Sequence, residues 1–149
     1  MKNVVLYAAK KGKGDHEEAA KEFIKDVSNA ISSGSGVFAY QIGKHTFVAN
    51  TNVLFIGSKV NGKGIPPRIV RNFIKKLKPE DVKLVVVYSV SKKGKVSAMA
   101  HFKSILDPLG VNVHENELFL NESKGAAAEE AMAEAKKFAS DVMMAFRGA

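Results

Sequence analysis

The chain contains no cysteine among its 149 residues. It therefore has no disulfide framework, no thiolate metal site, no iron–sulfur cluster and no cysteine nucleophile. Its longest apolar runs have only the length of a strand, so we expect no membrane-spanning segment. The start, Met1–Val5, enters a strand pattern at once and lacks the apolar region and cleavage site of a secretory signal. We therefore expect a cytoplasmic protein.

Motifs for metal binding and for nucleophilic catalysis are absent as well. The histidines lie far apart and show no H-x-x-x-H spacing: they are His16, His45, His101 and His114. There is no G-x-S-x-G motif. Neighbouring carboxylates, such as those of Glu115 and Glu117, are common around the end of a strand. We assign no catalytic residue and no metal ligand.

What the chain does have is positive charge, with a net charge of +8 and a pI of about 9.6. A basic surface favours acidic partners, phosphates, nucleic acid or anionic lipid. The alternative is a lysine-rich surface that only keeps the protein soluble. The length is that of one ordinary domain, and no linker or internal repeat is evident, so we expect one domain over residues 1–149.

Apolar runs of strand length alternate with amphipathic helical patterns. The predicted strands are Asn3–Ala8, Val37–Gln41, Val53–Gly57, Lys83–Tyr88 and Val111–Phe119, and Thr46–Val48 also has an extended pattern. The predicted helices are Asp15–Ser32, Pro66–Leu77, Val96–Leu109 and Ala126–Phe146, with Ile69 and Leu109 among the residues on their inner faces. This alternation predicts an α/β three-layer sandwich around a doubly wound, five-stranded parallel sheet.

Lysine and glycine gather in three short loops, each after a predicted strand. The loops contain Lys10, Lys11, Gly12, Lys13 and Gly14, then Lys59, Gly62, Lys63 and Gly64, then Lys92, Lys93, Gly94 and Lys95. If these strands are parallel neighbours, the loops meet at the carboxyl edge of the sheet, where open α/β sheets bind ligands. A bound phosphate is the economical inference, with solvated lysine turns as the alternative. Neither a P-loop nor a G-x-G-x-x-G pattern is present.

Four stretches resemble the flavodoxin family in order and spacing. They are Tyr7–Gly14 followed by Asp15, the apolar run Asn52–Ser58, the stretch Gly62–Pro67 with its helix to Leu77, and Leu84–Gly94. The resemblance covers nearly the whole chain. It implies the strand order 2-1-3-4-5, FMN as the cofactor, and one- or two-electron transfer.

The resemblance also implies which residues bind the cofactor. The phosphate would lie against the first loop, at Ala9, Lys10, Lys11, Gly12, Lys13 and Gly14. The flavin ring would be flanked by the two later loops, at Ser58, Lys59, Val60, Asn61 and Gly62 and at Ser89, Val90, Ser91, Lys92 and Gly94. Ser89 and Ser91 would hydrogen-bond the flavin edge or cap the helix that follows.

The chain departs from the family in three ways. Its first loop has Ala9, Lys11 and Gly14 where the family has hydroxyl side chains, so lysine charge would replace those donors. Its later loops contain no aromatic residue to stack on the ring, and Tyr88 is the nearest. Its loops are basic, where flavodoxins are acidic near the ring. If FMN binds, we expect a less reducing flavin than in an acidic flavodoxin, by Coulomb attraction.

Two functions remain open. The first is an FMN-binding electron-transfer protein that works with an acidic redox partner, as a monomer or weak dimer. The second is a binding module that has lost FMN and uses its lysine-rich edge for an acidic protein or a phosphorylated ligand. Nucleic acid is less favoured, because the loops lack aromatic residues for stacking and arginine is scarce. An enzyme with its own substrate is also less favoured, because the loops are too short to build a pocket.

Overall fold

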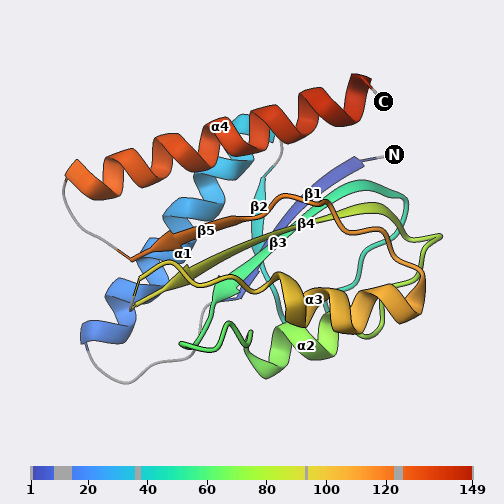
Figure 1. Ribbon diagram of the computed structural model, residues 1–149, viewed down its shortest axis with the longest axis horizontal. Helices are drawn as coiled ribbons and strands as arrows, with labels where there is room; N and C mark the ends of the chain where they lie inside the picture. The colour runs from blue at the N-terminus through green and yellow to red at the C-terminus, as the bar shows by residue number, and fades with distance from the viewer. Residues whose placement is uncertain (1, 9–14, 36–37, 93, 123–125, 149) are drawn as a thin grey trace.

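Five parallel strands form one sheet in the order β2-β1-β3-β4-β5, as predicted (Figure 1). The computed structural model describes residues 2–8, 15–35, 38–92, 94–122 and 126–148. The strands are β1 (Lys2–Ala8), β2 (Ala39–Gln41), β3 (Thr51–Lys59), β4 (Val82–Ser91) and β5 (Leu118–Asn121). Both the predicted fold class and the predicted strand order are confirmed.

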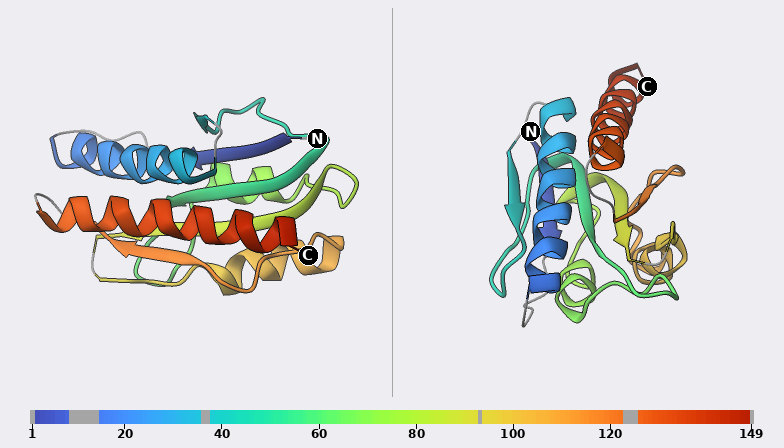
Figure 2. Two further views of the ribbon diagram at one scale, coloured as in Figure 1. Left: turned by 90° about the horizontal axis from the view of Figure 1, so that it is seen from above. Right: turned by 90° about the vertical axis from the view of Figure 1, so that its left-hand side faces the viewer.

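Helices cover both faces of the sheet and complete the three layers. They are α1 (Asp15–Ser35), α2 (Arg68–Ile74), α3 (Met99–Leu106) and α4 (Ala126–Gly148), with a 3-10 turn at Asp107–Leu109. The two long helices, α1 and α4, lie side by side on one face, and the short helices α2 and α3 lie on the other (Figures 1 and 2). No helix in the described ranges is both long and apolar enough to cross a bilayer.

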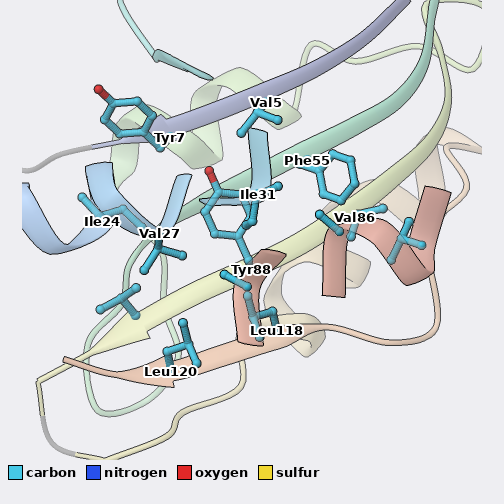
Figure 3. Close-up of a cluster of buried hydrophobic side chains, with 14 of the residues drawn as sticks. Val5, Tyr7, Ile24, Val27, Ile31, Phe55, Val86, Tyr88, Leu118 and Leu120 are labelled. Atoms are coloured by element: carbon cyan, nitrogen blue, oxygen red, sulfur yellow. The ribbon is translucent and has the colours of Figure 1, made fainter. Parts of the chain in front are cut away.

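Tyr88 fills the centre of the α1/α4 face, among Val27, Ile31 and Leu118 (Figure 3). Its hydroxyl donates to the Leu6 carbonyl oxygen at 2.9 Å and lies 2.8 Å from Ser28 Oγ. Burial raises the pKa of Tyr88 above its usual value, because the charged phenolate would lose its hydration. A neutral phenol with hydrogen-bond partners is therefore part of the core.

Gly57 of β3 makes room for that ring. It is paired with Tyr88 across β3 and β4, and a Cβ atom at Gly57 would overlap three atoms of the Tyr88 ring. The glycine of the apolar run Asn52–Ser58 is thus required by packing in the α1/α4 core.

On the α2/α3 face the core changes along the strands. Near the middle of the sheet it is aliphatic, with Leu54, Ile56, Val85 and Val87 packed under α2 and α3. Toward the carboxyl edge the alternation of side chains places small residues of the three central strands, β1, β3 and β4, on this face: Ala8, Ser58, Ser89 and Ser91, all buried. Small side chains let the connecting segments, rather than helices, cover this end of the sheet.

Two strands are longer than predicted and one is displaced. β3 and β4 run on to Lys59 and Ser91, which brings much of the predicted ring site into the sheet. The prediction for the last strand was wrong at its start, because the segment from Val111 makes only one bridge, Val113 to Val85, before β5 begins at Leu118. Five steps along this segment match three steps of β4, from Val85 to Tyr88, so two extra residues bulge out between them.

The short helices are trimmed at both ends. α2 begins after Pro67, and α3 begins after Ala98 and passes into the 3-10 turn that contains Pro108. Ile69 and Leu109, predicted to point inward, are each 37% exposed; Ile69 lies in the first turn of α2, and Leu109 lies past the end of α3 in the 3-10 turn. β2 is limited to Ala39–Gln41, and Thr46–Val48 forms no strand.

Candidate functional site at the carboxyl edge of the sheet

The predicted phosphate loop lies outside the described residues. This applies to Ala9, Lys10, Lys11, Gly12, Lys13 and Gly14. The residue before the loop, Ala8, is paired with Ser58 of β3. The residue after the loop, Asp15, begins α1. The described chain therefore leaves the sheet beside Ser58 and resumes at the start of α1.

Ser58 is fully buried, and its Oγ has no hydrogen-bond partner among the described residues. An unpaired buried hydroxyl is uncommon because it loses its bonds to water without replacement. Its pairing with Ala8 places it beside the end of β1.

Lys59 contacts the end of β5 instead of standing free. Its Nζ lies 3.8 Å from Glu122 Oε2, an ion pair too long to be a hydrogen bond. The Glu122 backbone N–H donates to the Ser91 carbonyl oxygen at 2.9 Å. Part of the positive charge expected from Lys59 is therefore compensated within the protein.

Asn61 holds the loop after β3 in a compact turn. Its Oδ1 accepts the backbone N–H groups of Lys63 at 2.9 Å and Ile65 at 3.0 Å, and its carbonyl accepts that of Gly64. Gly64 has φ +75°, and a Cβ there would overlap the Ser97 carbonyl oxygen. The loop after β3 thus packs directly on the loop after β4.

The loop after β4 is held by its own hydrogen bonds. Ser89 Oγ donates to the Val96 carbonyl oxygen at 3.1 Å, so this hydroxyl neither caps α3 nor is free for a ligand. The start of α3 is held instead by Glu117, which accepts from the Ser97 hydroxyl and from the Ala98 N–H. The Ser97 hydroxyl in turn accepts the Met99 N–H at 3.3 Å, so Ser97 and Glu117 together satisfy backbone donors at the start of α3.

The structure brings the two predicted ring loops together but buries many of their side chains. The Val60 N–H donates to the Val90 carbonyl oxygen at 2.9 Å, which extends the pairing of β3 and β4. The side chains of Ser58, Val60, Ser89, Val90 and Ser91 are buried. Asn61, Gly62 and Lys92 are exposed and Lys59 and Gly94 are half-buried, so these form the accessible part of the predicted site in the described chain. Tyr88, the nearest aromatic residue, belongs to the opposite face.

A hollow of about 480 Å³ lies between the loop after β3 and α2. It is lined by Lys59, Val60, Asn61, Ile65, Pro66, Pro67, Arg68 and Arg71. The volume is in the range of small-ligand sites. Arg71 Nε is buried without a hydrogen-bond partner in the described part of the chain, and no acidic residue lines the hollow. An anionic group, such as a phosphate, would satisfy that donor.

Arg68 and Arg71 were missed as site residues by the sequence analysis. A signal for them exists, since residues 27–79 contain no aspartate or glutamate but eight lysines and arginines. The rest of the chain is balanced, with fifteen basic and fifteen acidic residues, so the whole net charge of +8 comes from this stretch. Lysines near glycines indicated the three loops only. The absence of acidic residues indicates the loop after β3 and α2 together.

Comparison with solved structures shows which proteins share this fold. A flavodoxin from Streptococcus pneumonia TIGR4 superposes with a TM-score of 0.64 at 14% identity, over 97% of this chain and 99% of that one. A flavodoxin from the domain Archaea gives 0.65 at 13% identity, over 99% of both chains. A WrbA-like flavodoxin protein from Agrobacterium tumefaciens gives 0.67 at 10% identity, over 99% and 98%.

The chain has a flavodoxin-like fold. No family model matches it, and no curated protein matches it in sequence. The flavodoxin-like fold thus extends over the full length of the chain, while the residues at its carboxyl edge differ from the family pattern in the ways described above. Function has to be argued from that edge.

Proposed function

We propose that this flavodoxin-like protein binds FMN at the carboxyl edge of its sheet and carries electrons. The observation that carries the proposal is the hollow beside α2, with the unpartnered, buried Nε of Arg71 and the charge of Arg68 in its wall. The flavodoxin-like fold supports it, because ligands of doubly wound sheets bind outside the carboxyl ends of the strands.

The residues of the chain have distinct roles in this proposal. Arg71 and Arg68 hold an anionic group of the ligand, and the Ser58 hydroxyl is available to whatever lies beside the end of β1. FMN, when bound, supplies one- or two-electron transfer. The exposed Lys63, Lys92 and Lys95 provide positive charge at the edge, which favours the more negative redox state of a nearby group.

A second function is favoured by the contact between the two loops. Gly64 packs on Ser97, and the described residues of both loops offer no aromatic side chain to a flavin ring. An edge of this kind suits a phosphorylated ligand without a flavin, or an acidic protein. In that case the fold persists and the redox function does not.

Titration with FMN, followed by its visible absorption and fluorescence, tests the first proposal. We expect bound flavin in the wild type, and binding weakened about tenfold or more in Arg71→Gln, because a hydrogen bond to a charged group contributes about 1.5–3 kcal/mol. Lys103→Gln, at an exposed position of α3, is the matched control and should bind as the wild type does.

Riboflavin and inorganic phosphate, titrated in parallel, separate the two functions. Binding of FMN but not of riboflavin shows that the phosphate is required. No spectral change at millimolar FMN refutes flavin binding. Phosphate binding that is lost in Arg71→Gln would then support the second function.

A further inference from the structure

Some residues of the acid-free stretch, 27–79, line a second hollow, apart from the one proposed for flavin. This hollow of about 340 Å³ lies between the turn after β2 and α2, and it is lined by Gly43, Lys44, Thr46, Arg68, Ile69, Asn72, Phe73 and Lys76. Lys44, Arg68 and Lys76 are exposed and have no ion pair within the described ranges. Positive charge therefore surrounds a concave site with an apolar part.

Large apolar side chains gather in the same stretch. Of the six that are exposed in the described part of the chain, four belong to it: Phe38 at 79%, Tyr40 at 59%, Phe47 at 84% and Ile69 at 37% exposure. Ile69 lines the hollow, and Phe47 directly follows Thr46, which lines it too. Aromatic residues are enriched at protein interfaces, and exposed apolar patches mark interaction sites.

We propose that this face, which we call the β2–α2 face, docks an acidic protein partner. Its hollow is lined, among others, by Lys44, Arg68, Ile69, Phe73 and Lys76. The exposed side chains that we assign to it are Phe47, next to Thr46 in the chain, Tyr40 of β2, and Phe38 just before β2. Carboxylates of the partner pair with the lysines and Arg68, and an apolar side chain of the partner enters the hollow against Ile69 and Phe73. The inference does not rest on the proposed function: Arg68 lines both hollows, but Lys44, Phe47 and Lys76, on which the tests act, lie outside the flavin hollow.

The shape of the face favours a protein over other polyanions. A hollow that is apolar inside and basic around its rim fits a protruding apolar side chain flanked by acids, which is how anchor residues of protein partners bind. A bilayer would need a flat or convex face instead. A nucleic acid would use the open rings for stacking and would leave the hollow itself without a matching group.

Selection from a displayed library of random peptides provides the test. The bait is the full chain, with and without FMN. We expect the enriched peptides to combine aspartate or glutamate with one large apolar residue. Their affinity should fall about tenfold or more in Lys44→Glu/Lys76→Glu, a loss of about 1.4 kcal/mol or more. Lys136→Glu/Lys137→Glu on α4, also exposed, is the control and should change affinity less than about twofold.

The apolar part is tested by a second matched pair. Phe47→Ser should weaken the selected peptides, while Met144→Ser on α4, a residue 67% exposed, should not. Both side chains are exposed, so neither substitution should disturb the core, and a loss of binding reports on the face itself. These residues lie outside the proposed flavin hollow, so a failure of flavin binding leaves this test intact.

Three outcomes overturn the proposal. The first is enrichment of peptides without acidic character, and the second is equal binding by Lys44→Glu/Lys76→Glu. The third is tighter binding of oligothymidine or of phosphatidylserine vesicles than of any selected peptide, with that binding lost in Phe47→Ser. The third outcome would assign the face to nucleic acid or to a membrane surface.

Discussion

On one face of the sheet α1 and α4 have 21 and 23 residues, whereas on the other α2 and α3 have 7 and 8. The long helices cover their face over its whole length, α1 with large apolar side chains and α4 largely with alanines, and Tyr88 occupies its centre with its hydroxyl hydrogen-bonded. The short helices leave the carboxyl end of their face to loops that pack on small residues, beside hollows of about 340 and 480 Å³.

This difference separates stability from binding within one fold. Close packing on the α1/α4 face means that a small change in volume there is felt throughout the core. On the α2/α3 face, the unpartnered polar atoms Ser58 Oγ and Arg71 Nε lie where ligands of doubly wound sheets bind. Substitutions on the first face should therefore change the free energy of unfolding, and those on the second should mainly change binding.

The largest effect is expected for Gly57→Ala on the α1/α4 face. The added methyl group would overlap the buried Tyr88 ring, and overpacking of this kind costs about 3 kcal/mol. Urea unfolding followed by circular dichroism measures it. Gly62→Ala is the control, because a Cβ there meets no atom within 4 Å, and its effect should stay within about 0.5 kcal/mol. Equal losses in the two variants would contradict the packing argument.

A smaller loss is expected for Tyr88→Phe, which keeps the ring and removes the hydroxyl. The Leu6 carbonyl oxygen loses its 2.9 Å donor, at a cost of about 1–3 kcal/mol in unfolding free energy. Tyr40→Phe, at an exposed position of β2, should be close to neutral. A loss in Tyr40→Phe as large as in Tyr88→Phe would mean that the buried hydrogen bonds do not stabilise the core.

Tyr88 should also make the stability depend on high pH. Burial raises its pKa in the folded protein above the value of about 10 in the unfolded chain, so the unfolded state loses its proton first. Stability from this group is complete below about pH 10 and falls as the pH rises further. The free energy of unfolding of the wild type should be lower at pH 11 than at pH 9. In Tyr88→Phe the difference between the two pH values should be smaller. The same drop in both proteins would assign it to other groups.

A pair of serines compares the two faces directly. Ser28→Ala removes a hydroxyl that bonds both the Ile24 carbonyl oxygen and Tyr88, and should cost about 1 kcal/mol. Ser58→Ala removes a buried hydroxyl that lacks a partner among the described residues, and should leave stability unchanged or raise it by less than about 1 kcal/mol. A clear loss in Ser58→Ala would show that this hydroxyl is bonded in solution.

The sequence was sufficient for the architecture because each strand and helix has its own periodic pattern. The sequence was less informative where one apolar pattern is compatible with two ways of pairing a strand with its neighbour. The pattern from Val111 to Phe119 predicts one strand, but the two extra residues before Leu118 depend on contacts with β4 that no local pattern contains. Local alternation specifies which side chains face inward, and partner strands specify register.

The candidate site was harder to predict for a related reason. Lysines near glycines identified the edge, yet the bond from Ser89 to Val96 and the ion pair from Lys59 to Glu122 join residues that only the fold brings together. The positions of Arg68 and Arg71 depend on where α2 begins. It begins at Arg68, after both prolines, whereas the predicted helix began at Pro66. Absence of acidic residues over 27–79 was a readable signal, because it does not depend on register.

The smallest expected effect concerns the charge at the edge. If FMN binds, Lys63→Gln/Lys92→Gln/Lys95→Gln should make the bound flavin more strongly reducing, since positive charge nearby stabilises its more negative state. The three lysines are exposed, so salt screens them and the shift should shrink as ionic strength rises. A redox titration at low and high salt measures this, with Lys136→Gln/Lys137→Gln on α4 as the control. A hydroquinone couple in the wild type as low as in acidic flavodoxins, and unmoved in the triple variant, would show that these lysines do not act on the ring.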